Sequence, residues 1–269
     1  MAQGRFAKLE KSQSAPAAPS STAAAPKPVR APQTPYDGPE AYPTFIEEAE
    51  KAFFTGNYRD ALRHYSRALQ EDNAQVYPWI GQVSALLELK QYREAEIWST
   101  RGLEQFPENA SLLSQRARVL AATGNMKRAI GVSDYALSLG GNEWTWLARG
   151  EVLLHARDGN ALSCLEKAVE LAGPEDWRVP LLCGLCFMRH RQWSNAEAFL
   201  QMATVRNPRN AFAWTEYSRA LMELNHTDRA RDAIDRARQL APTLKGVMDL
   251  EHRLYNRSVF SRVMGMFRR

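Results

Sequence analysis

The sequence predicts an all-α fold, a solenoid of about six helix-turn-helix hairpins followed by an end helix. The first observation is an alanine that recurs at intervals of 34, 34, 32, 35 and 34 residues, at Ala61, Ala95, Ala129, Ala161, Ala196 and Ala230. The second is a small residue seven positions after each of them, at Ala68, Gly102, Ala136, Ala168, Ala203 and Ala237. A period of this length held over six copies is typical of stacked hairpins, in which each unit buries its face against its neighbours.

Tryptophan and proline mark the same period. Tryptophans stand near the start of three predicted first helices, at Trp79, Trp146 and Trp214, and prolines close three predicted second helices, at Pro107, Pro208 and Pro242. The stretch from Trp79 to Pro107 resembles one tetratricopeptide repeat, and the resemblance covers residues 43–242. It implies hairpins stacked into a right-handed superhelix with a concave peptide-binding groove, and no common catalytic activity.

The first three hairpins follow the period closely and are expected over residues 43–73, 77–107 and 111–141. Their turns are predicted at Gly56-Asn57-Tyr58, Lys90-Gln91-Tyr92 and Gly124-Asn125. At the first of them, Gly56 supplies the left-handed conformation that ends a helix. A small or slender residue stands at the eighth position of each first helix, namely Ala49, Val83 and Ala117. The two helices of a hairpin are therefore expected to cross closely at this position.

The fourth hairpin and the end of the solenoid are less regular. The fourth copy lacks one residue around Arg157-Asp158-Gly159 and one in the preceding loop, whereas the next loop, at Gly173-Pro174, gains one. A local change in the superhelix is expected there. Beyond Pro242, apolar residues at helical spacing predict a capping helix whose packed face holds Leu244, Val247, Met248 and Leu254.

The chain divides into residues 1–40, 41–242 and 243–269. The first segment is rich in Ala, Pro and Ser and is expected to be a disordered tail, in which Arg5-Phe-Ala-Lys-Leu-Glu10 is either a docking motif or an ordinary free end. The second is the solenoid of six repeats, and the third holds the capping helix and a basic C-terminal segment. Without a secretory signal, a membrane-span-length apolar run or enough cysteines for a disulfide framework, the sequence predicts a cytoplasmic protein.

No catalytic motif, cofactor site or metal site is predicted. Cys183 and Cys186 form a Cys-x-x-Cys with His190 four residues later, and Cys164 could complete a zinc site. The cysteines fall mid-helix at positions that face neighbouring helices, which favours buried structural residues. The five histidines are scattered without a motif, so we predict no enzyme. Nucleic-acid binding is not expected, because the net charge of +5 arises in the ends and residues 41–244 carry −1.

The groove is the predicted binding site. The resemblance implies that the second, fifth, sixth, ninth, twelfth and thirteenth positions of each first helix face inward, and they form an unusually apolar lining here. The expected partner is another protein, bound as an extended peptide or a helix. The candidate residues are Ile46, Glu50, Phe53, Tyr77, Ile80, Ser84, Leu87, Arg118, Trp144, Leu147, Glu151, Leu181, Leu185, Met188, Phe212 and Arg219. Coverage of some of them by the tail or the end helix is the alternative.

A second candidate surface lies at the C-terminus. Apolar residues recur there at helical spacing beside arginines, namely Val259, Phe260, Arg262, Val263, Met264, Phe267, Arg268 and Arg269. A basic amphipathic helix can lie on an anionic membrane surface, which would make the protein a peripheral membrane adaptor, or it can dock a partner. Packing of this stripe on the sixth repeat is the equal alternative. The sequence leaves the partner's identity, the pathway and the oligomeric state open.

Overall fold

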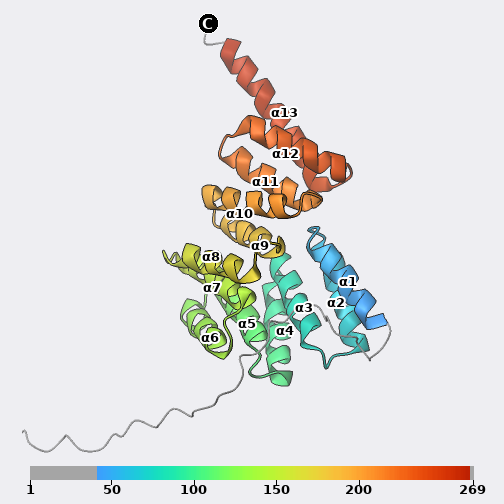
Figure 1. The fold of residues 1–269 in the computed structure, drawn as a ribbon, viewed down its shortest axis with the longest axis vertical. Coiled ribbons are helices and arrows are strands. Elements are labelled where there is room, and N and C mark those ends of the chain that lie inside the picture. Colours follow the sequence, from blue (N-terminus) through green and yellow to red (C-terminus); the bar gives the residue numbers. More distant parts are fainter. Residues whose placement is uncertain (1–40, 267–269) are drawn as a thin grey trace, which may run out of the picture.

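The computed structural model describes residues 41–266, with side chains up to Leu254 and that of Asn256, and this part is built of thirteen helices and no strand. The predicted tail over residues 1–40 lies outside the described residues. Six hairpins stack in sequence order, so the predicted all-α solenoid is confirmed (Figure 1). The first helices of the hairpins are α1 (Ala41–Phe53), α3 (Val76–Glu88), α5 (Ala110–Ala122), α7 (Glu143–Ala156), α9 (Arg178–Arg189) and α11 (Ala211–Glu223). The second helices are α2 (Tyr58–Glu71), α4 (Tyr92–Gln105), α6 (Met126–Leu139), α8 (Ala161–Ala172), α10 (Trp193–Arg206) and α12 (Thr227–Leu240), and α13 (Lys245–Met266) follows them.

The periodic small residues set how closely the helices of each hairpin pack. The recurring alanines of the second helices are almost fully buried in all six hairpins. A Cβ atom placed on Gly150 would come within 2.5 Å of the Cγ atom of Leu165, and one on Gly184 would lie equally close to Leu200. The eighth position of these two first helices therefore has no room for a side chain. This close approach is the physical cause of the small-residue pattern in the sequence.

A left-handed residue ends every first helix. Gly56 and Gly124 have φ values of 78° and 85°, as the turns predicted from glycine require. The equivalent residues of the other four hairpins are not glycines, yet their φ values lie between 56° and 61°, at Lys90, Arg157, Arg191 and Asn225. Such a conformation costs about 1–2 kcal/mol in a non-glycine residue, so the packing of the hairpin overrides the local preference.

Asparagine side chains cap three of the first helices. Asn109, Asn142 and Asn210 precede α5, α7 and α11, and their side-chain oxygens accept hydrogen bonds from backbone N–H groups of the first turn. At α7, Thr145 also accepts from the backbone N–H of Asn142, which completes a reciprocal capping box. These bonds satisfy donors that a helix start would otherwise leave unpaired.

The C-terminal helix α13 caps the solenoid by packing on α11 and α12. Val247, Leu250 and Leu254 are buried there. The prediction was wrong about Met248, which is 51% exposed. The buried residues follow Val247 at steps of three and four, and Met248 lies outside this helical face. The backbone helix continues to Met266, so the cap and the start of the basic segment share one helix. In the described residues, every helix is too short or too polar to cross a membrane.

The first hairpin also contacts the fifth and sixth hairpins, which lie more than a hundred residues further along the chain (Figure 1). The rings of Phe54 and Trp177 meet edge to face with centroids 5.4 Å apart, and those of Tyr58 and Phe212 are 6.4 Å apart. The side-chain amide of Asn210 donates a 3.0 Å hydrogen bond to the carbonyl oxygen of Phe54. We call this contact the closure. The sequence predicted a concave groove, and the closure between distant hairpins was not predicted.

Candidate functional site on the concave face

The first helices bring most of the predicted groove residues to one cavity, which we call the inner cavity. Its wall is contributed by α1, α2, α3, α5, α7 and α9, so it lies on the concave side of the solenoid. Eight of the predicted residues line it: Glu50, Phe53, Tyr77, Ile80, Ser84, Arg118, Trp144 and Leu147. The lining also includes Phe54, Ser114, Gln115 and Arg178, which stand at repeat positions predicted to face inward. Tyr65, Ser111 and Leu182 complete it.

The polar groups at one side of the inner cavity are paired with one another. The hydroxyl of Tyr77 donates to the carboxylate of Glu50. The guanidinium of Arg178 donates to Asp176 from two nitrogens, at 2.9 and 3.2 Å, and lies 4.0 Å from Glu50. Because Glu50 belongs to α1 and Arg178 to α9, this ion pair adds to the closure. This part of the lining thus carries charges, whereas the rest is mostly aromatic and aliphatic.

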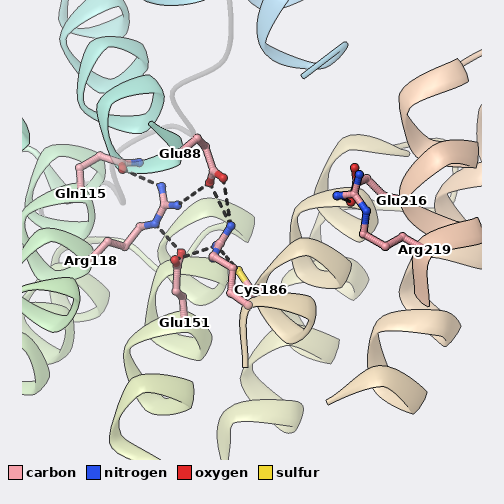
Figure 2. A network of polar contacts seen from close by, with 8 residues as sticks. Glu88, Gln115, Arg118, Glu151, Cys186, Glu216 and Arg219 are labelled. Carbon is pink, nitrogen blue, oxygen red and sulfur yellow. Dashed lines mark hydrogen bonds and ion pairs between the residues drawn. The ribbon is translucent and has the colours of Figure 1, made fainter. Parts of the chain in front are cut away.

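A cluster of two arginines and two glutamates lies across the middle of the concave face (Figure 2). Arg118 donates to Glu151 at 2.6 Å and to the Gln115 side chain at 2.8 Å, and its guanidinium is 3.6 Å from Glu88. Arg189 donates to Glu88 at 3.1 Å and to Glu151 at 2.8 Å. The four charged residues come from α3, α5, α7 and α9, so the cluster ties four successive hairpins together without net charge.

The ionisation of Glu151 follows from this cluster. Burial alone would raise the pKa of Glu151, but the guanidinium groups of Arg118 and Arg189 outweigh it and hold the pKa well below its usual range. The Glu151 carboxylate therefore stays charged at any pH near neutrality. A buried carboxylate with two arginine partners is a structural element that fixes helix positions, because its removal would leave two positive charges with only the Glu88 carboxylate between them.

A second cavity lies beyond the charged cluster, and its lining includes four further groove candidates: Leu185, Met188, Phe212 and Arg219. Glu88 and Arg189 also line it, whereas Arg118 lines the inner cavity, so the cluster lies between the two cavities. Glu216 is buried at its edge and accepts a 2.9 Å hydrogen bond from Arg219 (Figure 2). Burial raises the pKa of Glu216, and the nearby Arg219 offsets this only in part.

The remaining candidates do not line either cavity. Ile46 and Leu181 are buried in the packing between helices, Leu87 packs against a small core cluster of α3, and Glu151 belongs to the charged cluster. Leu147 and Leu185 line cavities but are also more than nine-tenths buried. Several of the apolar positions that suggested an exposed binding surface are thus covered by the chain's own hairpins.

The cross-repeat pairing of charges is the feature that sequence reasoning missed. Glu50, Arg118 and Glu151 stand at the ninth position of their first helices, and Glu88 and Arg189 at the thirteenth. Each was predicted to face inward, but the opposite signs in neighbouring repeats were not read as ion pairs. Arg118 and Glu151 are 33 residues apart, which is one repeat, and this spacing was the available signal.

The other chemical candidates give no site in the described residues. Cys183 and Cys186 are buried, and burial raises the pKa of both thiols, so they stay protonated. A group of three or more side chains able to hold a metal ion does not occur in the part that the structure describes. The predicted C-terminal stripe, Val259 to Arg269, falls where side chains lie outside the described residues, so its docking role stays a prediction.

Comparisons with known proteins address the fold. No curated protein sequence matches the chain. Among solved structures, a monomeric mutant of IFIT1 with m7Gppp-AAAA is similar at 14% identity and a TM-score of 0.55, over 79% of this chain and 54% of that one. TTC0263, a thermophilic tetratricopeptide protein of Thermus thermophilus, matches at 17% identity and a TM-score of 0.47, over 81% and 100% of the two chains. YrrB, described as a tetratricopeptide protein with an unusual peptide-binding site, matches at 20% identity and a TM-score of 0.42, over 70% and 97%.

A family model describes part of the chain directly. Residues 184–244 match the tetratricopeptide repeat model, and this stretch spans most of the fifth and sixth hairpins. The same residue period and hairpin geometry extend through the four preceding hairpins. The family generally consists of non-catalytic scaffolds for protein–protein interaction. Residues 184–244 are therefore similar to tetratricopeptide repeats in sequence, and the whole solenoid resembles that fold in its residue period and its hairpins.

Proposed function

We propose that this protein is a non-catalytic adaptor that holds a segment of a partner protein against its concave face, at the inner cavity. The observation that supports this most is the cavity itself, which gathers aromatic and aliphatic side chains from four different hairpins. Phe54, Ile80 and Leu182 are only partly buried there, so they offer apolar surface to an incoming group. A concave apolar site with a few polar groups is the usual form of a binding pocket.

The closure restricts how such a segment binds. With the first hairpin joined to the fifth and sixth, the inner cavity admits single side chains more readily than a whole helix. An extended segment that inserts one or two anchor side chains therefore fits the closed form, and the helical alternative requires the closure to open. Anchors of this kind carry most of the binding free energy in protein interfaces.

A matched pair of substitutions tests this proposal. Peptides selected from a random display library on the full chain should bind Ile80→Glu at least about 30-fold more weakly, because a lost anchor contact is worth about 2 kcal/mol. The control is Val205→Glu, which makes the same kind of change on a 73% exposed residue of the outer helix α10. Binding of the selected peptides is measured by fluorescence anisotropy. Equal affinity for both variants would place the peptide site elsewhere on the protein.

A further inference from the structure

A groove on the outer side of the solenoid lies between two second helices, α8 and α10. The helix α8 packs on α7 and α9, and α10 packs on α9 and α11, but the two do not pack on each other. A hollow of about 440 Å³ lies between them, and we call it the outer groove. Its lining takes one face of each helix, namely Leu162, Glu166, Val169 and Glu170 from α8 and Asn195, Ala198, Phe199 and Met202 from α10.

Apolar side chains run along the outer groove. Val169 and Phe199 are 8% and 6% exposed and form its floor, whereas Leu162 and Met202 are half-buried and Ala198 is exposed. On each helix the lining residues recur at three- and four-residue steps, so they belong to one helix face. Apolar grooves between helices bind the apolar face of an amphipathic helix through anchors at the same spacing.

The charge of the outer groove is negative. Glu166 and Glu170 are the charged residues of its lining, and both are exposed. Lys167 donates to Glu170 at 2.9 Å, but an ion pair between exposed side chains is weak. The remaining polar residue of the lining, Asn195, donates to the side chain of Gln192. The outer groove therefore fits a helix that carries positive charges beside an apolar face.

The C-terminal segment of this chain has that chemistry. Residues 255–269 contain four arginines and no acidic residue, and their apolar residues recur at helical spacing from Val259 to Phe267. This C-terminal stripe covers eight residue steps, and the α8 side of the outer groove, from Leu162 to Glu170, covers eight as well. Eight steps of an α-helix measure about 12 Å, so the stripe and the groove match in length.

The stripe of one copy cannot enter the outer groove of the same copy. The helix α13 packs on α11 and α12 through Val247, Leu250 and Leu254 and continues without a break to Met266, beyond the last hairpin and away from α8 (Figure 1). Val263 follows these three buried residues by 16, 13 and 9 positions, which places it about 140–180° around the helix from each of them. The centre of the stripe thus lies opposite the face that packs on its own solenoid.

We propose that two copies of this chain associate by docking the C-terminal stripe of one copy into the outer groove of the other. The apolar residues of the stripe cover the floor of the groove, and the arginines beside it lie near Glu166 and Glu170. The contact is separate from the inner cavity, so it requires neither a partner peptide nor the closure. Each copy carries one stripe and one groove, so a reciprocal contact closes a twofold dimer and a one-way contact continues as a chain.

Sedimentation velocity of the full chain over a range of concentrations tests this association. The natural chain should associate, whereas a stripe variant, Phe260→Asp with Val263→Asp, and a groove variant, Ala198→Arg, should each need at least about 30-fold higher concentrations. Ala198 is exposed, so the added side chain leaves the hairpin intact, which circular dichroism checks. A natural chain that stays monomeric, or a groove variant that associates like the natural chain, would overturn the proposal.

The matched control is Gly131→Arg on α6. Gly131 and Ala198 each stand two residues after the recurring alanine of their hairpin, and a side chain added at Gly131 meets open space. This control should associate like the natural chain. Loss of association in both arginine variants would mean that added charge acts without regard to its place, and would contradict the assignment of the groove.

A mixture of the two defective variants tests the pairing itself. The stripe variant keeps its groove and the groove variant keeps its stripe, so an equimolar mixture should form a one-to-one complex at concentrations where each variant alone is monomeric. A mixture that stays monomeric would overturn the proposal. Co-sedimentation with phosphatidylserine vesicles covers the other occupant of the stripe. A natural chain that binds these vesicles through the stripe but stays monomeric in solution would overturn self-association in favour of an anionic membrane surface.

Discussion

Glu151→Ala is expected to lower the free energy of unfolding by about 3–5 kcal/mol, because it leaves the guanidinium groups of Arg118 and Arg189 with Glu88 as the one remaining carboxylate of the cluster. Arg118 is buried, so the excess positive charge left in the cluster cannot be solvated in place. The loss should appear in urea denaturation followed by circular dichroism. Asp60→Ala is the matched control, because it breaks the exposed pair with Arg63 and should cost no more than about 1 kcal/mol.

The same carboxylate predicts the direction of the pH dependence. The folded-state pKa of Glu151 is lower than that of the unfolded chain, so its contribution to stability is complete above the unfolded value of about 4.3 and is lost as the pH falls below it. The difference in stability between the natural chain and Glu151→Ala should therefore stay constant from neutrality down to about pH 4.3 and shrink as the solution is acidified further. A difference that is small at neutral pH would contradict the structural role of the cluster.

Phe212→Ala is expected to open the closure between the first hairpin and the sixth. The ring of Phe212 packs on Tyr58 and also lies against Gly56, where an added Cβ would be 2.6 Å from it. Loss of this partly buried ring should destabilise the closed form by about 2 kcal/mol. The equilibrium between the closed form and the open form should then shift roughly 30-fold toward the open form. The closure rests on few further contacts, so this shift is large relative to its total strength.

Energy transfer across the closure measures that opening. Dyes are attached at Thr55→Cys and Arg209→Cys, which flank the closure on its two sides, and the three natural cysteines are buried and do not compete for label. Transfer should fall in Phe212→Ala and stay unchanged in Tyr135→Ala, an aromatic deletion on the outer helix α6. Unchanged transfer in Phe212→Ala would mean that the first hairpin is held by contacts other than this ring.

Asn210→Asp probes the hydrogen bond of the closure alone. The side-chain oxygen of Asn210 accepts from the backbone N–H of Ala213 and caps α11, while its amide donates to the carbonyl of Phe54. Aspartate keeps the cap but cannot donate, so energy transfer should fall in this variant without loss of helix content. This one substitution thus distinguishes the contribution of Asn210 to the helix cap from its contribution to the closure.

Local and periodic features of the fold could be predicted from the sequence, because they recur in every repeat. The alanine spacing and the small eighth positions gave the hairpins and their crossing. The left-handed residues at Lys90, Arg157 and Arg191 could not be found from composition, since glycine is the only strong signal for that conformation. Their occurrence shows that hairpin packing outweighs a local preference.

The closure and the charged cluster depend on contacts between distant repeats, and no local pattern encodes them. Phe54 and Trp177 look like ordinary aromatic residues near helix ends until the superhelix brings them together. The inward direction of Arg118 and Glu151 followed from their repeat positions, but their pairing depends on the rotation between hairpins. The sequence therefore indicated which side chains face inward, whereas only the structure shows which of them pair with one another between the two cavities.

The most direct test of the partner-binding account is hydrogen exchange of the full chain with and without a peptide selected on it. The account predicts slower amide exchange in the first helices α1, α3, α5 and α7, which line the inner cavity, and no change in the outer helices α4, α6, α8 and α10. Slower exchange confined to the outer helices would place the partner on the convex surface and contradict the account.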